Sequence, residues 1–322
     1  MSSLPRLSVI TPSYNQAAFL EMTLRSVLRQ DYPNLEYMVI DGASTDGSVA
    51  IIERYASQLA WWVSEQDQGQ ADAINKGFAR ATGEIVAWIN SDDVYLQGTL
   101  HKAVEALQAH PQWVMVHGNM LSIDAHSQVT NEQVFGDWGL DGLMRFQIIG
   151  QPTVFMRRKA LAKAGFLDAK FNLLLDNQLW LRIAQSGPIG HLPQLWAAAR
   201  YHPGAKNVAQ AAKYGLEAHE LDRWMQSQPE LADRYWKNVR RIHAGLYCYE
   251  AHYLLDGGLP RQALSAYLHG LASHPATALK YWRRIAYILA GVFVNTNNRR
   301  ERYLEQRKRR YARYQSLLEY LQ

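Results

Sequence analysis

Strand-like and helix-like segments alternate along the first 118 residues of this chain. Short apolar runs that predict strands lie at residues 7–11, 35–41, 84–90 and 114–118. Runs with helical spacing of apolar residues lie between them, at residues 15–30, 49–57, 71–83 and 98–109. This alternation is typical of a mostly parallel sheet that is covered by helices on both faces. We therefore expect the N-terminal part of the chain to have an α/β fold.

Residue types at two helix ends indicate where these helices begin and end. Asn15 precedes the first helical run, and asparagine is a favoured N-cap residue. Gly83 follows the run at 71–83, and glycine commonly ends a helix because it tolerates left-handed backbone angles. We therefore expect Asn15 to cap the first helix and Gly83 to close the third.

Polar residues stand where three of the predicted strands end. Thr11, Asp41 and the pair Asp92–Asp93 follow apolar runs directly. In α/β sheets, ligands bind beyond the carboxyl ends of the strands. Adjacent carboxylates repel each other, and a divalent cation such as Mg²⁺ or Mn²⁺, which prefers oxygen ligands, removes this repulsion. The pair predicts a metal site, and the alternative is a solvated turn after a strand.

The character of the chain changes after residue 206. Glycine becomes sparse, and helical periodicity dominates. Residues 251–275 predict a helical hairpin, whose second helix has the spacing of a tetratricopeptide repeat at Ala263, Tyr267, Gly270 and Pro275. An apolar helix is predicted at 278–293. We expect two domains, one at 1–206 and a helical C-terminal region at 207–322.

The positive charge of the chain is concentrated near its C-terminus. The whole chain has a formal net charge of +5, whereas residues 299–313 contain eight lysines and arginines and two glutamates. The remainder is close to neutral, so attraction to anionic partners would involve the tail. One interpretation is a helix that packs on the main body through its tyrosines and leucines. The other is peripheral membrane contact through residues 278–322.

Cysteine content and hydropathy bear on where the protein works. Cys248 is the single cysteine, so an internal disulfide is excluded. The N-terminus does not have the pattern of a signal peptide, and the longest apolar run, 288–294, is far shorter than a membrane span of ~20 residues. We expect a cytoplasmic protein, with peripheral contact to the inner face of the membrane as an extension. We expect no nucleic acid partner, because no basic groove or binding module is recognised.

Four separated motifs, TPSYN, VIDGAS, ADAINKG and NSDD, occur in the order found in the inverting family 2 glycosyltransferases of the GT-A fold. The chain resembles this family over roughly residues 7–205, in particular its bacterial polysaccharide and cell-envelope members. The resemblance implies a Rossmann-like GT-A sheet and binding of a nucleotide-sugar. It makes glycosyl transfer more plausible than the nucleotidyl transfer that α/β enzymes with metal sites also perform.

The resemblance implies roles for residues of these motifs. Nucleotide contacts are implied at Thr11, Tyr14, Asp41, Asp72, Lys76 and Asp92, with Asn75 near the nucleotide and sugar. The family's metal motif, D-x-D, has Ser91 at its first position here, so Asp93 is the expected metal ligand. Packing remains an alternative for Tyr14, and a surface position remains one for Lys76. A turn-forming role is an equal alternative to ligand binding for Asp46.

Two later segments, 165–184 and 199–207, resemble the acceptor side and the closing loop of the family. Asp176 is the implied general base, and capping of the helix at 177–185 is its alternative. His202 is implied to meet the metal or diphosphate, and Arg200 the diphosphate. Gln151 is implied as an acceptor contact. Leu175 stands where the family has a second acidic residue.

The expected activity is an inverting, metal-dependent glycosyl transfer (a hexosyl- or N-acetylhexosaminyltransferase, EC 2.4). Its donor would be a nucleoside-diphosphate sugar, with UDP favoured by the resemblance. Its acceptor would be a hydroxyl group of a saccharide or of a polyprenyl-linked saccharide. The cofactor would be Mn²⁺ or Mg²⁺. The alternative function is a catalytically inactive nucleotide-binding scaffold or interaction protein.

Overall fold

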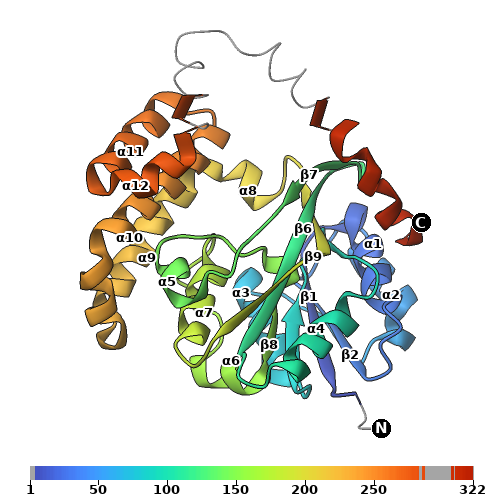
Figure 1. The fold of residues 1–322 in the computed structure, drawn as a ribbon. Helices are drawn as coiled ribbons and strands as arrows, with labels where there is room; N and C mark the ends of the chain where they lie inside the picture. The colour runs from blue at the N-terminus through green and yellow to red at the C-terminus, as the bar shows by residue number, and fades with distance from the viewer. Residues whose placement is uncertain (1–3, 283–284, 287–305, 308, 322) are drawn as a thin grey trace. The chain divides into compact units, whose positions relative to one another are not determined.

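The computed structural model describes residues 4–282, 285–286, 306–307 and 309–321 of this chain, which fall into two compact units (Figure 1). The sheet unit comprises Met1–Gly139, Ile149–Arg200 and Arg307–Gln322, and the helical unit comprises Leu140–Ile148 and Tyr201–Gln306. The units thus differ from a single division at residue 206, because residues 307–322 join the sheet unit and residues 140–148 join the helical unit.

The sheet unit contains strands and helices in alternation. Its strands are β1 (Leu7–Ser13), β2 (Leu35–Asp41), β3 (Trp61–Ser64), β4 (Ile85–Trp88), β5 (Val94–Tyr95), β6 (Met115–Asp124), β7 (Val129–Gln133), β8 (Phe155–Arg157) and β9 (Ile189–Tyr201). Its helices are α1 (Ala17–Leu28), α2 (Ser48–Tyr55), α3 (Gln70–Arg80), α4 (Thr99–Ala109), α6 (Arg158–Ala164) and α7 (Leu175–Ala184). The predicted α/β architecture is confirmed.

Within the described residues, nine strands form one mixed sheet in the order β3-β2-β1-β4-β8-β6-β9-β5, with β7 paired to β6. Strands β1, β2, β3 and β4 pair in parallel, and β8 runs antiparallel to both β4 and β6. The parallel part lies within the segment of alternating strand and helix signals, whereas β6, which contains most of the strand predicted at 114–118, pairs antiparallel with β7 and β8. The ends of the parallel strands therefore meet at one edge, as the sequence predicts.

Burial explains why these segments form a layered core. Strand β1 is buried along its whole length, which requires cover on both faces. Helix α1 contributes Leu20, Leu24 and Val27, which recur at helical spacing and are fully buried in the same core cluster as Val9. Burying each such side chain stabilises the fold by about 1.5–3 kcal/mol.

The two predicted helix ends differ from the structure. Helix α1 begins at Ala17 and not beside Asn15, because the Ala17 amide donates to the Asp46 carboxylate at 2.8 Å. Helix α3 ends at Arg80, so Gly83 does not close it. Gly83 instead lies against β1, where an added Cβ would fall 2.6 Å from the Ser8 nitrogen. Contacts with distant strands therefore determine both positions.

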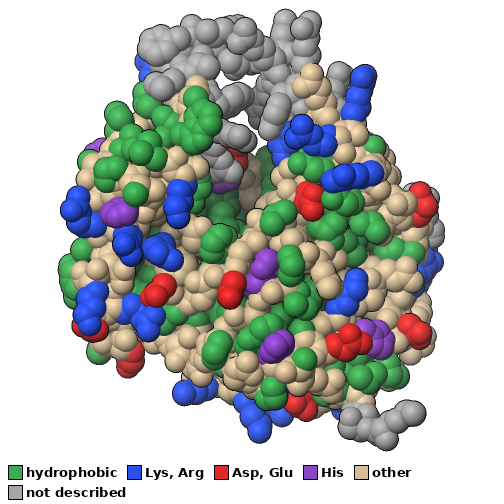
Figure 2. Space-filling view, viewed as in Figure 1, with side chains coloured by type: hydrophobic (Ala, Val, Ile, Leu, Met, Phe, Trp, Pro, Cys, Tyr) green, Lys and Arg blue, Asp and Glu red, His purple; other side chains and the backbone are tan. Residues whose placement is uncertain are grey.

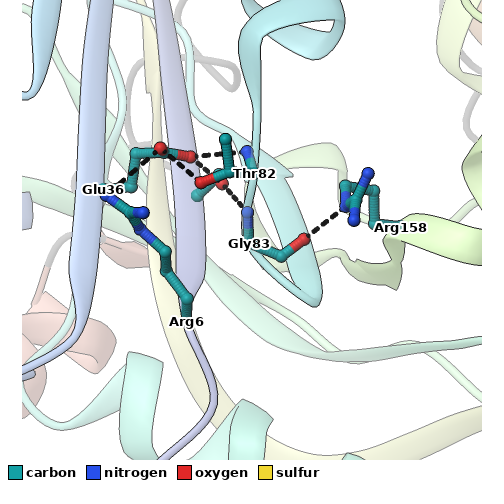
Figure 3. Close-up of polar contacts among 6 residues, drawn as sticks. Arg6, Glu36, Thr82, Gly83 and Arg158 are labelled. Carbon is teal, nitrogen blue, oxygen red and sulfur yellow. Dashed lines mark hydrogen bonds and ion pairs between the residues drawn. The ribbon is translucent and has the colours of Figure 1, made fainter.

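A buried carboxylate joins the amino ends of β1, β2 and the turn before β4 (Figure 3). Glu36 accepts hydrogen bonds from the Ser8 hydroxyl at 2.5 Å, the Thr82 amide at 2.8 Å and the Thr82 hydroxyl at 2.7 Å. Arg6 lies 3.4 Å from the same carboxylate. This network lies at the sheet edge opposite the strand ends that carry Asp41 and Asp93.

The helical unit consists mainly of antiparallel helices. They are α5 (Gly139–Met144), α8 (Lys206–Ala209), α9 (Tyr214–Ser227), α10 (Pro229–Asp256), α11 (Pro260–Ser273) and α12 (Pro275–Ala278). The predicted hairpin is confirmed as α10 and α11, and Ala263 and Tyr267 are fully buried in its core. Most of the apolar helix predicted at 278–293, and residues 299–305 and 308 of the basic tail, lie outside the described residues.

The end of the chain returns to the sheet unit. Residues 311–321, including the helical turns η5 (Ala312–Leu321), pack on this unit through Leu318 and Leu321. Packing through leucines, one of the two interpretations of the tail, is confirmed for this part. Of the helices within the described ranges, none is long and apolar enough to cross a bilayer. On the face shown in Figure 2, basic side chains are interspersed with acidic and apolar ones.

The Glu36 network predicts a pH-dependent contribution to stability. Burial alone would raise the pKa of Glu36, but hydrogen bonds from Ser8 and Thr82 hold it below the ordinary value. The contribution is therefore fully present above the pKa of an unfolded glutamate and is lost as the pH falls through the lower folded value. Glu36→Gln should lower the free energy of unfolding at pH 7 by about 1–3 kcal/mol.

Chemical denaturation at a series of pH values checks this expectation. Glu36→Gln should remove part of the loss of stability that the wild type shows at acid pH. Glu53→Gln, at an exposed position of α2, is the matched control and should behave as the wild type. Equal stability of both variants at pH 7 would contradict the role assigned to Glu36.

Candidate functional site

The parallel strands bring their carboxyl ends to one edge of the sheet. Ser13 at the end of β1 is in register with Asp41 at the end of β2, and Asp41 with Ser64 at the end of β3. Trp88 at the end of β4 pairs with Ile10 of β1. The loops that follow these strands therefore form a continuous rim, and this rim contains most of the residues predicted from the sequence.

Asp41 is fully buried and holds two loops of the rim together. Its carboxylate accepts from the Ser44 amide at 2.8 Å, the Ser44 hydroxyl at 2.6 Å and the Ser64 hydroxyl at 2.7 Å. Both oxygens are thus occupied within the protein. Asp41 fixes the loop after β2 to the end of β3, and a direct nucleotide contact would have to share these bonds.

Asp46 connects the loop after β2 to the start of α1. One oxygen accepts from the Ala17 amide at 2.8 Å, and the other accepts from the Ser48 amide at 3.0 Å and the Ser48 hydroxyl at 2.6 Å. Burial would raise the pKa of Asp46, but these hydrogen bonds hold it below the ordinary value. The turn-forming role proposed for Asp46 is confirmed.

Tyr14 and Thr11 occupy opposite environments on and after β1. The Tyr14 side chain is 62% exposed at the rim, so its ring is available to a ligand. Thr11 is fully buried, and its hydroxyl lies 2.9 Å from the Tyr37 hydroxyl in the core. The prediction of a nucleotide contact by the Thr11 side chain does not fit this arrangement, because β1 is covered on both faces and the Thr11 hydroxyl lies against Tyr37.

Asp67 lies beside Tyr14 and was not predicted from the sequence. A Cβ added to Gly42 would fall 2.7 Å from an Asp67 oxygen and 3.3 Å from the Tyr14 ring, so all three residues meet at one point of the rim. Asp67 also accepts from the Gly69 amide at 2.8 Å. The signal that would have identified it is the short strand β3, because Asp67 lies in the loop after this strand.

Helix α3 carries three predicted residues with different environments. Lys76 pairs with Glu65 at 3.0 Å and with Asp72 at 3.3 Å, and the hydrogen bond to Glu65 raises the pKa of Lys76. Partly exposed pairs of this kind contribute at most about 1 kcal/mol, so a ligand can compete for them. Asn75 exchanges two hydrogen bonds of 2.9 Å with the Leu167 backbone, which fixes the acceptor-side segment to α3.

The acidic pair lies in the loop between β4 and β5, and its second member is buried. Asp93 is 5% exposed, and its carboxylate accepts from the Arg200 amide at 2.9 Å and from the Asn90 side chain at 3.4 Å. Burial, followed by the charge of Asp92, raises the pKa of Asp93 well above the ordinary value, although the Arg200 amide opposes this shift. Ionising both members of the pair is therefore costly unless a cation compensates their charge.

Three amide side chains form a chain of hydrogen bonds beside this pair. Gln70 donates to Asn90 at 2.8 Å, Asn90 donates to Gln151 at 3.2 Å, and Gln151 donates to the Trp88 carbonyl at 2.9 Å. The hydrogen bonds to Asn90 and to the Trp88 carbonyl thus fix the orientation of the Gln151 side chain, which is predicted to contact the acceptor. Asn90 and Gln70 were missed, although Asn90 stands immediately before the Ser-Asp-Asp motif.

Arg200 binds the acidic pair from inside the protein. Its guanidinium donates to the Asp92 carbonyl at 3.0 Å, the Asp124 carbonyl at 2.9 Å and the Ser127 hydroxyl at 2.9 Å, and the residue is 3% exposed. Burial lowers the pKa of Arg200, while Asp93 and Asp92 oppose this effect. The predicted diphosphate contact does not fit a guanidinium that is buried and hydrogen-bonded in this way.

Asp176 lies in the first turn of α7. Leu174 precedes the helix without a side-chain cap, whereas Asp176 accepts from the Asn177 amide of the first turn at 2.8 Å. The alternative that Asp176 helps to cap this helix therefore stays open beside the role of a base. Trp180, four residues later on the same helix face, stacks on Trp88 with ring centroids 5.1 Å apart. This stacking fixes the start of α7 relative to the strand that leads to Asp93.

His202 lies in the helical unit, just after β9. Its carbonyl accepts from the Ala205 amide at 2.9 Å, and its ring lies over Gly204. Its predicted contact with the metal or diphosphate stays a prediction.

The carboxylates of the acidic pair suit a metal ion whose remaining ligands come from the substrate and from water. No group of three or more histidine, cysteine, aspartate or glutamate side chains arranged for a metal occurs in the described part of the chain. Mg²⁺ is commonly bound by one or two carboxylates together with substrate phosphates and water. The buried Asp93 and the half-buried Asp92 supply such carboxylates, and their mutual repulsion favours a cation.

Known proteins with similar sequences are glycosyltransferases. The model of Glycosyl transferase family 2 matches residues 8–159. An uncharacterized glycosyltransferase of Mycobacterium tuberculosis is 31% identical over 194 residues, which are 57% of this chain and 71% of the relative.

Two solved structures share the fold. The mannosyltransferase PcManGT from Pyrobaculum calidifontis, in complex with GDP-Man and Mn²⁺, is 23% identical with a TM-score of 0.59, over 99% of this chain and 86% of that one. S. aureus TarS 1-349 in complex with UDP-GlcNAc is 17% identical with a TM-score of 0.56, over 87% of this chain and 92% of that one. The predicted GT-A-like fold is confirmed.

The environment of Arg200 predicts a structural effect of its replacement. Arg200→Lys keeps the positive charge but replaces the planar guanidinium group with an ammonium group, so at least one buried hydrogen bond is lost. The free energy of unfolding should fall by about 1.5–3 kcal/mol, as measured by chemical denaturation. Arg54→Lys, which alters a half-exposed pair with Glu21, is the control and should change stability little. Unchanged stability with weaker diphosphate binding would restore the predicted diphosphate contact.

Proposed function

Because the chain belongs to glycosyl transferase family 2, we propose that it transfers a sugar, with inversion, from a nucleoside-diphosphate donor to a hydroxyl group. The acceptor is a saccharide or a polyprenyl-linked saccharide of a cell-envelope polysaccharide. One observation carries this proposal. The buried Asp93 lies beside Asp92 at the carboxyl edge of the parallel strands, where their negative charge favours a cation that bridges to a diphosphate.

The rim around Tyr14 binds the nucleoside in this proposal. The exposed ring of Tyr14 offers a face for the base, while Gly42 and Asp67 close the same point of the rim. Asp41 acts by holding the loop that frames the ribose and base. Asp72 and Lys76 of α3 lie partly exposed, and Lys76 can exchange its partners for phosphate oxygens. UDP is the proposed nucleotide, and a hexose or N-acetylhexosamine is the proposed sugar.

Asp93 would hold a divalent cation, Mn²⁺ or Mg²⁺, and His202 would add a further ligand or a diphosphate contact. Asp92 would lie toward the ribose or the sugar. The cation, when bound, neutralises charge on the leaving diphosphate. Arg200 supports this site through the Asp93 carboxylate and the Asp92 backbone. Its buried positive charge limits the repulsion between the two aspartates before a ligand arrives.

Asp176 is the proposed general base for a single displacement at the anomeric carbon. The acceptor oxygen forms the new bond to this carbon while the bond to the diphosphate oxygen breaks, and the proton of the acceptor hydroxyl passes to the Asp176 carboxylate. The stacking of Trp180 on Trp88 holds α7 in place for this step. Gln151, oriented by Asn90, is proposed to position the acceptor.

Ligand binding tests the donor site. A nucleoside diphosphate at ~100 times its dissociation constant should stabilise the protein by ~2.7 kcal/mol, and the shift should require Mn²⁺. UDP, TDP, GDP and ADP, each with and without Mn²⁺, are compared by thermal unfolding.

Asp93→Asn should remove the Mn²⁺-dependent part of this shift, because it removes the charge that favours the cation. Asp233→Asn, at an exposed position of α10, is the control and should keep the shift. Absence of any shift with all four diphosphates would favour the scaffold alternative.

Removal of the proposed base tests the chemical step separately. Asp176→Asn should lower the transfer rate by about 10²- to 10⁴-fold, because the amide cannot accept the proton. Its diphosphate binding should stay at the wild-type level. Asp168→Asn changes a carboxyl group of the same acceptor-side segment and is the control. Parallel loss of binding and transfer in Asp176→Asn would exclude the role of a base.

A further inference from the structure

The C-terminal segment, residues 311–321, packs on the part of the sheet unit that carries the acidic pair. The helical unit separates it in sequence from the other segments of the sheet unit. Figure 1 shows this segment, in red, beside α1 and the end of β7. The segment contacts β5, which follows Asp93 in the chain, and the turn at Ser127. This turn supports Arg200, whose amide donates to Asp93.

Apolar packing forms the base of this contact. Leu318 and Leu321 are buried in one cluster with Val94 and Leu96, which flank Tyr95 in and after β5. Val94 directly follows Asp93 in the chain. The same cluster includes Leu121, Ile123, Val129 and Ala198. The segment therefore packs against β5, which begins at the residue after Asp93.

Hydrogen bonds then connect the segment to β5. The Tyr320 hydroxyl donates to the Tyr95 carbonyl, and burial raises the pKa of Tyr320 well above its ordinary value. Gln30 of the sheet unit donates to the Leu96 carbonyl at 3.0 Å and to the Tyr320 hydroxyl at 3.4 Å. A two-residue strand such as β5 has few ladder bonds of its own, so these added bonds matter to its position.

A second set of contacts connects the segment to Asp93 through the turn between β6 and β7. Gln315 donates to the Ser127 carbonyl at 3.0 Å and accepts from the Val129 amide at 3.0 Å. Ser127 has a left-handed backbone with φ of 62°, which costs free energy and needs support from its surroundings. The Ser127 hydroxyl accepts from Arg200, whose amide donates to Asp93.

We propose that residues 311–321 position the acidic pair. Tyr320 holds β5 on one side of Asp93, and Gln315 holds the turn that supports Arg200 on the other side. The segment thereby sets the placement of the Asp93 carboxylate and the affinity of the site for a divalent cation. The inference about cation affinity rests on the proposed function, whereas the inference about the placement of the Asp93 carboxylate does not.

Two tyrosine variants of the full chain separate positioning from general stability. Tyr320→Phe removes the hydroxyl that binds the Tyr95 carbonyl. Tyr314→Phe removes a hydroxyl of the same segment that donates to Glu132 of β7 at 2.9 Å, away from β5. The first measurement is hydrogen exchange of the amides of Asp93, Tyr95 and Leu96, each of which donates a hydrogen bond in the structure.

We expect faster exchange at these amides in Tyr320→Phe than in Tyr314→Phe, by up to roughly tenfold for one lost hydrogen bond. The second measurement is the Mn²⁺ concentration that gives half of the UDP-dependent thermal shift. It should rise by up to roughly tenfold in Tyr320→Phe and stay unchanged in Tyr314→Phe. Gln315→Ala should act in the same direction through the turn at Ser127, and it replaces Tyr320→Phe if that variant folds poorly.

Equal exchange at Asp93, Tyr95 and Leu96 in both tyrosine variants would overturn the proposal and leave the segment a stabilising contact only. Faster exchange with an unchanged Mn²⁺ requirement would overturn the link to cation affinity. A wild type without any Mn²⁺-dependent shift would instead count against the proposed function, while the exchange measurement would still decide the placement of β5.

Discussion

The buried negative charge of Asp93 is the constraint around which the sheet unit is arranged. A carboxylate removed from water needs hydrogen bonds and opposite charge, and a second carboxylate precedes it in the chain. Arg200 at the end of β9 and Asn90 after β4 provide this compensation. Each of them is held in turn by other elements: Arg200 by the turn at Asp124 and Ser127, and Asn90 by the amides of Gln70 and Gln151. One charge thus couples segments that are far apart in sequence.

The polar residues at the carboxyl edge divide into two groups. Asp41, Asp46 and Asn75 use their side chains to fix one loop to another. Tyr14 and Asp176 remain at least partly accessible on supports that these bonds make rigid. Such a division is expected where a site must be preorganised, because loops that are free to move would place reactive groups poorly. It also explains why a motif match does not by itself identify a ligand contact, since Thr11 and Arg200 occupy motif positions and lie inside the protein.

Local sequence patterns predicted three of the four strands that pair in parallel, the helical hairpin and the acidic pair near a strand end. These features depend on periodicity and on residue type, which are visible in a short window. The helix start at Ala17 and the close approach of Gly83 to Ser8 depend on distant loops and strands, so local spacing misplaced both. The same holds for Arg200, whose partners lie between residues 92 and 127, and for the C-terminal segment, whose leucines find their partners on β5 to β9. Long-range contacts of this kind are not encoded in any one segment.

The return of residues 311–321 to the sheet unit has a consequence for biosynthesis. During translation, at about 5–20 residues per second, these residues follow Arg200 by roughly 5 to 20 seconds. In that interval the sheet unit is synthesised but Val94, Leu96 and Leu121 are without their apolar cover. The nascent chain therefore carries an exposed apolar surface next to its acidic pair while the helical unit is being made. A chain that stalls within the helical unit would leave this surface exposed.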